Sequence, residues 1–188
     1  MLESPEELAV ADRSLTRLDE MYGLFGEQPP PYRHCEPSEV PEPQRSLLHH
    51  ERHMTVTLER FHEVDVRLTV LQEVHRGDFY SRKILLSRPD ETVVQFGLMR
   101  IDLRRVHQAA REAILEGARP LGRILIDEEI LRRISMHGLL RLEPNDELRE
   151  VAGPQDGEGP LFGRLATILC NESPAVDLLE VVCNCDVD

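Results

Sequence analysis

The sequence predicts an α+β fold, a single antiparallel β-sheet whose flanking helices act as flaps. Three observations predict it. Apolar residues alternate strictly over 64–74, as in a half-buried strand. Two more strand-like runs, at about 78–87 and 92–101, are joined by a turn-forming Ser-Arg-Pro-Asp sequence. Near the end of the chain, 161–170 and 175–183 flank Asn-Glu-Ser-Pro, which is a hairpin signal. Strand runs joined by hairpins and few helices favour antiparallel pairing.

The first part of the chain differs in character from the rest. Leu15, Leu18, Tyr22 and Phe25 follow helical spacing, which predicts an amphipathic helix over about 5–25. A proline-rich segment follows over 26–44, which we expect to be an extended linker or a strap over the surface. We therefore divide the chain into an extension, 1–45, and a domain, 46–188.

The remaining elements of the domain are predicted from shorter patterns. A short helix is expected over 46–53, and a longer one over 103–116 that ends at the glycine following it. The next segment is ambiguous, because 121–126 favours a strand and 130–134 a helical turn. The acidic stretch 146–160 contains glycine and is expected to be an exposed loop.

Composition excludes several classes of partner. A formal net charge of −13 argues against nucleic acid and anionic membranes, and aromatic residues are too scarce, at 4%, for a base-stacking surface. No apolar run approaches the roughly 20 residues of a membrane span. The acidic start lacks the parts of a signal peptide, so we expect a cytoplasmic protein with reduced cysteines. The oligomeric state stays open, with a monomer favoured.

Two charged residues stand where the strand pattern places apolar ones. Arg82 shares a strand face with Tyr80, Ile84 and Leu86, and Glu180 shares one with valine and leucine. An unpaired ion in such surroundings costs several kcal/mol, so each charge needs a partner. The two residues either pair with each other, or Arg82 receives an anionic ligand and Glu180 a hydroxyl group.

Other candidate sites are weaker. His49 and His53 would share a helical face, but the spacing is not HExxH and no third metal ligand is indicated. Cys183 and Cys185 would lie on one strand face. The simpler interpretation is that they are ordinary residues of the tail that bind no metal. The backbone N–H groups of the glycine-containing turn 117–123 could receive a carboxylate, although the same residues serve as a plain helix stop.

Several motifs, in order along most of the domain, resemble the chorismate pyruvate-lyase family and its broader bacterial relatives. They are the strand Tyr-Ser-Arg-Lys-Ile-Leu-Leu at 80–86, the G-x-x-P-L-G-R turn at 117–123, Phe-Gly-Arg at 162–164 with Leu-Glu at 179–180, and Met-Thr at 54–55.

The resemblance implies conversion of chorismate to 4-hydroxybenzoate and pyruvate, with no metal and no organic cofactor. By position, Arg82 would bind the ring carboxylate together with the backbone N–H of Leu121. Glu180 would face the end of the ring where the enolpyruvyl ether leaves, and Met54 would add backbone contacts there. The implied fold is one antiparallel sheet with helical flaps that enclose the ligand.

The chain departs from the family pattern at one arginine. The best-known members carry arginine directly after the glycine of the third strand, whereas Leu98 follows Gly97 here. Arg100 lies two residues beyond Leu98 on the same strand face and is the candidate replacement. It would then bind the second carboxylate of chorismate.

Two alternatives to a lyase stay open. One is a non-catalytic domain that binds small aromatic acids, as in the effector domains of some bacterial transcription regulators. The other is a pathway protein that kept the pocket and lost the activity. The presence of both Arg82 and Glu180 favours catalysis, because a pure binding protein needs the arginine more than the carboxylate.

Overall fold

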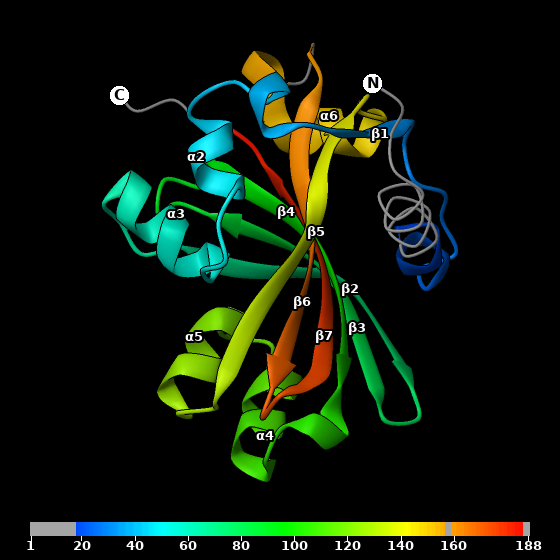
Figure 1. Ribbon diagram of the computed structural model, residues 1–188, viewed down its shortest axis with the longest axis vertical. Coiled ribbons are helices and arrows are strands. Elements are labelled where there is room, and N and C mark those ends of the chain that lie inside the picture. Colours follow the sequence, from blue (N-terminus) through cyan, green and yellow to red (C-terminus); the bar gives the residue numbers. More distant parts are fainter. Residues whose placement is uncertain (1–17, 157–158, 186–188) are drawn as a thin grey trace.

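The computed structural model describes residues 18–156 and 159–185 and is built around one twisted antiparallel sheet (Figure 1). The sheet has seven strands in the order β1-β5-β6-β7-β4-β3-β2. The strands are β1 (Tyr32–Cys35), β2 (Arg67–Arg76), β3 (Phe79–Ser87), β4 (Val93–Asp102), β5 (Arg132–Leu142), β6 (Leu161–Cys170) and β7 (Ser173–Val182). The predicted α+β class with a single antiparallel sheet is therefore confirmed.

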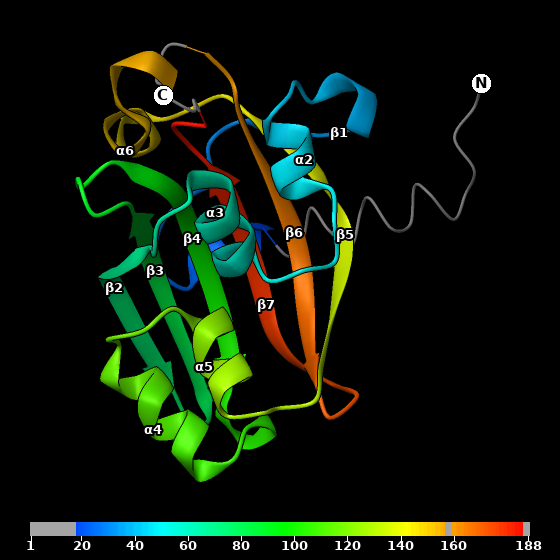
Figure 2. The ribbon, with the colours of Figure 1, turned by 90° about the vertical axis from the view of Figure 1, so that its left-hand side faces the viewer.

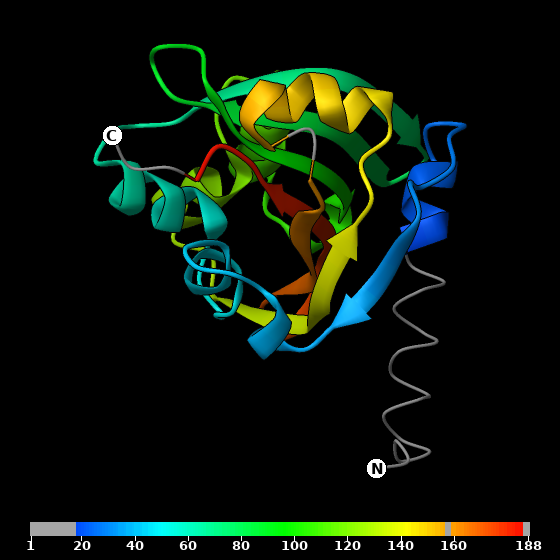
Figure 3. The ribbon, with the colours of Figure 1, turned by 90° about the horizontal axis from the view of Figure 1, so that it is seen from above.

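Helices cover both faces of this sheet. The helices are α2 (Gln44–Leu48), α3 (Met54–His62), α4 (Gln108–Glu116), α5 (Leu121–Asp127) and α6 (Asp146–Asp156), and short 3-10 turns span Pro37–Glu39 and Leu103–Arg105. Helices α2 to α5 lie over one face, in front of the strands in Figure 2. We call this the cavity face. Residues 18–23, which are helical, and α6 cover the opposite face, as the view from above shows (Figure 3).

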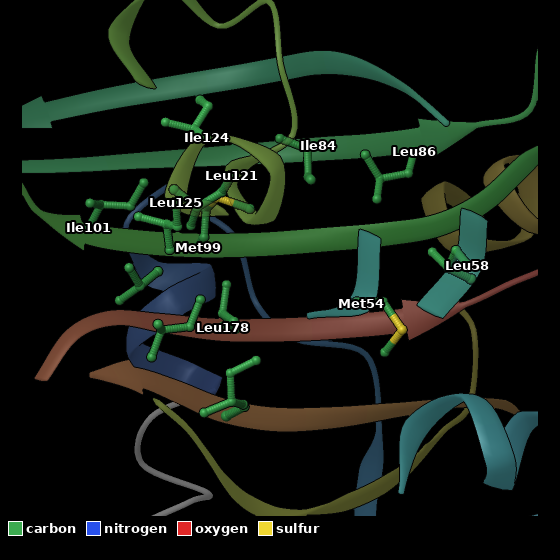
Figure 4. Close-up of a cluster of buried hydrophobic side chains, with 14 of the residues drawn as sticks. Met54, Leu58, Ile84, Leu86, Met99, Ile101, Leu121, Ile124, Leu125 and Leu178 are labelled. Atoms are coloured by element: carbon green, nitrogen blue, oxygen red, sulfur yellow. The ribbon is translucent and has the colours of Figure 1, made fainter. Parts of the chain in front are cut away.

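Each face of the sheet has its own apolar core. On the cavity face, side chains from α3 and α5 such as Leu58 and Leu121 pack against strand residues such as Ile84, Met99 and Leu178 (Figure 4). On the opposite face, a second cluster joins the N-terminal helix and α6 to β4 and β7. The central strands are thus buried on both sides, which explains why their sequences are nearly continuous apolar runs.

The closing hairpin is confirmed and its register contains a bulge. Asn171 and Glu172 form its two-residue turn with φ values of 48° and 64°, the left-handed conformation of a type I′ hairpin turn. The register then shifts by one residue between Ile168 and Leu169. Beyond the shift, Arg164 lies directly opposite Glu180.

Four expectations for local structure were wrong or incomplete. Residues 121–127 form a helix and 132–142 a strand, the reverse of the predicted tendencies, because the apolar run of α5 packs as a helix over the sheet. The stretch expected as a loop contains α6, whose Leu148 and Ala152 are buried against the opposite face. The second half of the expected 46–53 helix has no regular secondary structure, since α2 ends at Leu48.

The fourth difference concerns the proline-rich extension. Residues 32–35 form β1, an edge strand of the same sheet, paired with β5. An edge strand needs only one side of its backbone paired, so nearby prolines are tolerated. The predicted helix over 5–25 is seen for residues 18–23, where Leu18 and Tyr22 are buried as expected, and the residues before 18 lie outside the described part.

Other features follow the sequence closely. The helix expected over 103–116 is divided into the 3-10 turn Leu103–Arg105 and α4, and Gly117 ends α4 in the left-handed conformation as predicted, with φ of 69°. The strand predicted over 64–74 is β2, and a bulge between Val70 and Gln72 turns its second half over, so that Val74 packs with the opposite-face cluster. None of the described helices is both long and apolar enough to cross a membrane.

Candidate functional site

Two arginines are completely buried on the cavity face. Arg82 on β3 and Arg164 on β6 each have 0% exposure, and both lie among the apolar side chains of the first cluster. Strand alternation places them there, because Tyr80, Ile84 and Leu86 on the same face as Arg82 all belong to that cluster. The predicted inward direction of Arg82 is therefore what the structure shows.

Arg164 has a full set of partners. Its Nε donates to Oε2 of Glu180 at 2.6 Å, which makes a buried ion pair. Its Nη1 donates to the backbone carbonyl of His50 at 2.6 Å, and its Nη2 to that of Arg52 at 3.0 Å. A longer contact of 3.4 Å reaches the carbonyl of Leu48. Arg164 therefore joins the floor of the sheet to the segment between α2 and α3.

Arg82 has far fewer partners. Its Nε lies 3.2 Å from the sulfur of Met99, its Nη1 lies 3.5 Å from the carbonyl of Ile114, and its Nη2 is buried with no hydrogen-bond partner. Among the described residues no carboxylate lies within ion-pair distance of it; Tyr80 is its polar neighbour, and the Tyr80 hydroxyl in turn donates to Glu73 at 2.9 Å. Burial lowers the pKa of the Arg82 guanidinium, which nevertheless stays protonated at neutral pH.

A cavity lies beside these arginines, between the sheet and helices α3 and α5. The surrounding side chains fill most of it, because the space open to a water-sized sphere is only about 20 Å³. Its lining is mostly apolar and consists of His53, Met54, Thr55, Ile84, Leu86, Gln95, Met99, Pro120, Leu121, Gly122, Ile134, Arg164, Ile168, Leu178 and Glu180. The lining, mainly apolar with a few polar groups, is typical of a small-molecule site, and a ligand that contains an aromatic ring would require these side chains to move apart.

Most of the predicted site residues meet at this cavity. Glu180, Leu121 and Met54 all line it. Leu121 is the first residue of α5, where the helix provides no acceptor for its backbone N–H. Arg82 does not line the cavity itself but contacts Met99, which does, so its guanidinium lies one side chain behind the wall.

Arg100 is the exception. Leu98 belongs to the opposite-face cluster, and Arg100 shares its face, away from Arg82. There the Arg100 guanidinium stacks on the ring of Phe79, 4.2 Å from its centroid. The candidate replacement for the family arginine therefore points away from the cavity. The arginine that lines the cavity is Arg164.

Of the two arrangements left open for Arg82 and Glu180, direct pairing with each other is excluded. Glu180 pairs with Arg164 and not with Arg82. Across the sheet, Arg82 lies opposite Met99 and Glu180 opposite Gly97, on successive strands β3, β4 and β7. Two strand spacings and a two-residue offset put their Cα atoms about 12 Å apart.

The segment 49–53, which we call the cover segment, has no regular secondary structure and contributes His53 to the cavity lining. His53 lines the cavity, and its Nε2 accepts a hydrogen bond from Nε of Arg132 at 2.7 Å. Burial, with Arg164 and Arg52 nearby, lowers the pKa of His50 to about 4. Burial, with Arg132 nearby, lowers the pKa of His53 to about 4 as well. Both imidazoles are therefore neutral at pH 7.

Other candidate sites are placed as follows. Within the described residues, no group of three or more His, Cys, Asp and Glu side chains is arranged to hold a metal ion. Cys183 and Cys185 are both buried. On the opposite face, Lys83 is 3% exposed and forms 2.7 Å ion pairs with Glu27 and Glu147. That cluster attaches the N-terminal segment and α6 to the sheet.

The site thus defines a class of protein: an α+β domain with a sheet-backed apolar cavity, a buried guanidinium behind its wall and a carboxylate in its lining. The sequence matches no protein-family profile, and a search of curated proteins finds no match. Assignment of a function therefore rests on the residues and their geometry.

Proposed function

We propose that this protein is a lyase that eliminates pyruvate from chorismate to give 4-hydroxybenzoate or a close aromatic acid. The observation that carries the proposal is Arg82, a completely buried arginine without a carboxylate partner among the described residues, beside an apolar cavity. A buried guanidinium with an unused N–H group is suited to bind a carboxylate by charge-assisted hydrogen bonds.

The remaining groups fit the same ligand. The ring carboxylate would accept from Arg82 and from the backbone N–H of Leu121. Met99 would have to shift to let it reach the guanidinium, and the other lining side chains would have to move apart to admit the ring. The ring would lie against apolar side chains such as Ile84 and Leu178, which line the cavity. Glu180 would face the other end of the ring, held in place by Arg164.

The chemistry needs little beyond positioning. The ether C–O bond breaks, the ring carbon that bears the hydroxyl loses a proton, and the released enolpyruvate gains a proton at its methylene carbon to become pyruvate. Aromatisation of the ring drives the reaction. Holding the dianion in a reactive geometry and moving one proton are thus the tasks of the protein. We assign the proton transfer to Glu180.

A second candidate function is a non-catalytic domain that binds aromatic acids. One observation favours it: the ion pair with Arg164 and the contacts of Arg164 to the cover segment give Glu180 a structural role. In that case Arg82 alone would account for ligand recognition, and the carboxylate would be needed only for the fold.

One experiment separates the two functions. Purified protein is incubated with chorismate, and pyruvate and 4-hydroxybenzoate are quantified beside an Arg82→Ala control. Equal amounts of both products, absent in the control, would support the lyase. Binding of 4-hydroxybenzoate that depends on Arg82, without pyruvate, would support the binding domain. If the protein neither converts chorismate nor binds 4-hydroxybenzoate, both functions are excluded.

A further inference from the structure

The cavity and the outside of the protein share a wall. His53 and Ile134 line the cavity, and the same two residues line an open hollow on the surface between β5 and the cover segment. Five charged residues also line that hollow: Glu51, Arg52, Glu129, Arg132 and Arg133. Three are cationic and two anionic, so the hollow is locally positive on a chain whose formal net charge is −13.

The two halves of this wall are held in different ways. Ile134 belongs to β5, whose backbone is paired with β6. The backbone leading to His53 is held from inside by Arg164, and Gly122 leaves room for the His53 side chain, because a Cβ there would lie 3.2 Å from that of His53. The imidazole itself is held by its 2.7 Å hydrogen bond from Nε of Arg132.

We propose that the His53 ring closes the cavity toward the hollow, as a gate, and that the hydrogen bond from Arg132 holds the ring in place, as a latch. Small carboxylates enter the cavity from the hollow when the ring moves. A carboxylate accepts from a guanidinium more strongly than a neutral imidazole does. A ligand arriving at Arg132 therefore replaces His53 as the acceptor, frees the ring to turn aside, and passes inward toward Arg82. The identity of the ligand, an aromatic carboxylate, rests on the proposed function.

The gate is tested first without any ligand. A thiol is introduced on the cavity floor by Leu178→Cys, with Ile168→Cys as a second position should the first variant fold poorly. Cys35→Ser removes the one native cysteine that is not buried. The rate at which a small thiol reagent labels the introduced cysteine is then compared with and without Arg132→Gln, after subtraction of the parent's background.

We expect Arg132→Gln to raise the labelling rate about 5- to 10-fold, the scale of one lost hydrogen bond. Arg133→Gln is the matched control, since it removes the same charge from the same hollow. Arg133 is exposed, and the hydrogen bond described for His53 comes from Arg132. It should leave the rate unchanged. Equal rates in all three proteins, or equal increases in both variants, would overturn the gate.

The second test uses 4-hydroxybenzoate and measures its association and dissociation rates. A latch changes both rates together, so Arg132→Gln should raise each about 5- to 10-fold and leave Kd within about twofold. A change in Kd that comes from the dissociation rate alone would make Arg132 part of the binding site and would refute the latch. If 4-hydroxybenzoate does not bind at all, the proposed function fails while the labelling result still decides the gate.

Discussion

The contrast between the two buried arginines leads to an unusual prediction about stability. Arg82 and Arg164 are both completely buried on the same sheet face, but within the described residues only Arg164 has a carboxylate at ion-pair distance. Replacing each by methionine keeps an unbranched side chain of similar length. We expect the two substitutions to change the free energy of unfolding in opposite directions.

Arg82→Met removes few favourable contacts and relieves a large desolvation cost. The substitution removes a 3.5 Å contact to the carbonyl of Ile114, which is long for a hydrogen bond, and the contacts with Met99 and Tyr80. It also removes the attraction of Glu73, which lies opposite Arg82 on β2 beyond ion-pair distance. It also removes a desolvated charge, and exchanging buried ionic groups for apolar ones is often stabilising by about 1–4 kcal/mol. We expect a gain of about 1–3 kcal/mol, or roughly 2–12 °C in Tm for a chain of this size.

For Arg164→Met the balance is reversed. The carboxylate of Glu180 stays buried without its partner, and the carbonyls of His50 and Arg52 lose their donor. Removing one member of a buried pair costs about 3–5 kcal/mol. The same variant should also loosen the cover segment, which hydrogen exchange of residues 49–53 would report.

Urea unfolding at pH 7 measures both changes, and calorimetric titration with 4-hydroxybenzoate measures binding. Arg82→Met should weaken binding by about 2–5 kcal/mol, the usual loss for one partner of a buried charge pair, or roughly 30- to 5,000-fold. The reasoning is refuted if Arg82→Met lowers stability by more than about 2 kcal/mol while ligand affinity stays intact, because Arg82 would then be a structural residue.

Three further predictions concern the site and its cover. Glu180→Gln keeps the size of the side chain and should lower kcat about 10²- to 10⁴-fold if the carboxylate moves a proton; full turnover in a pyruvate-release assay would remove that role. Gly163→Ala should cost about 1–3 kcal/mol, because its Cβ would lie 2.8 Å from the backbone oxygen of Glu180, whereas Gly159→Ala, with no neighbour within 4 Å, should change stability little. The lowered pKa values of His50 and His53, about 4 for each, mean that the unfolded chain binds protons first as the pH falls. The contribution of these two histidines to the free energy of unfolding is present above about pH 6.5 and is lost as the pH falls toward 4. The urea midpoint should therefore drop over that window. If a His50→Asn, His53→Asn double variant shows the same drop in the urea midpoint, the titration of other groups causes it.

Side-chain alternation made the burial of Arg82 and Glu180 predictable, and the two-residue turn made the closing hairpin predictable. The pairing of Glu180 was not predictable from the same pattern. Continued strictly from the Asn171–Glu172 turn, the register would place Glu180 opposite Gly163. The bulge near Pro174 moves it by one residue and brings Arg164 into position instead. A single bulge thus places the carboxylate that compensates Arg164.

The errors in the helices have a similar origin. The apolar run of α5 is compatible with a strand or with a buried helix, and only its packing over the sheet decides. In α6 the acidic residues suggested a loop, but they lie around a short apolar stripe that includes Leu148 and Ala152. Arg100 was placed on the same face as Leu98 correctly. The error was to expect that face to carry the ligand.

The buried Lys83 has a practical consequence for anyone who handles this protein. It is the sole lysine of the chain, and its ammonium group is sealed between Glu27 and Glu147. A lysine-specific protease therefore has one peptide bond to cut, in the middle of β3 and one residue beyond Arg82. Cleavage requires that strand to leave the sheet. The rate of cleavage at this single bond therefore reports opening of the core, and no label has to be attached to the protein.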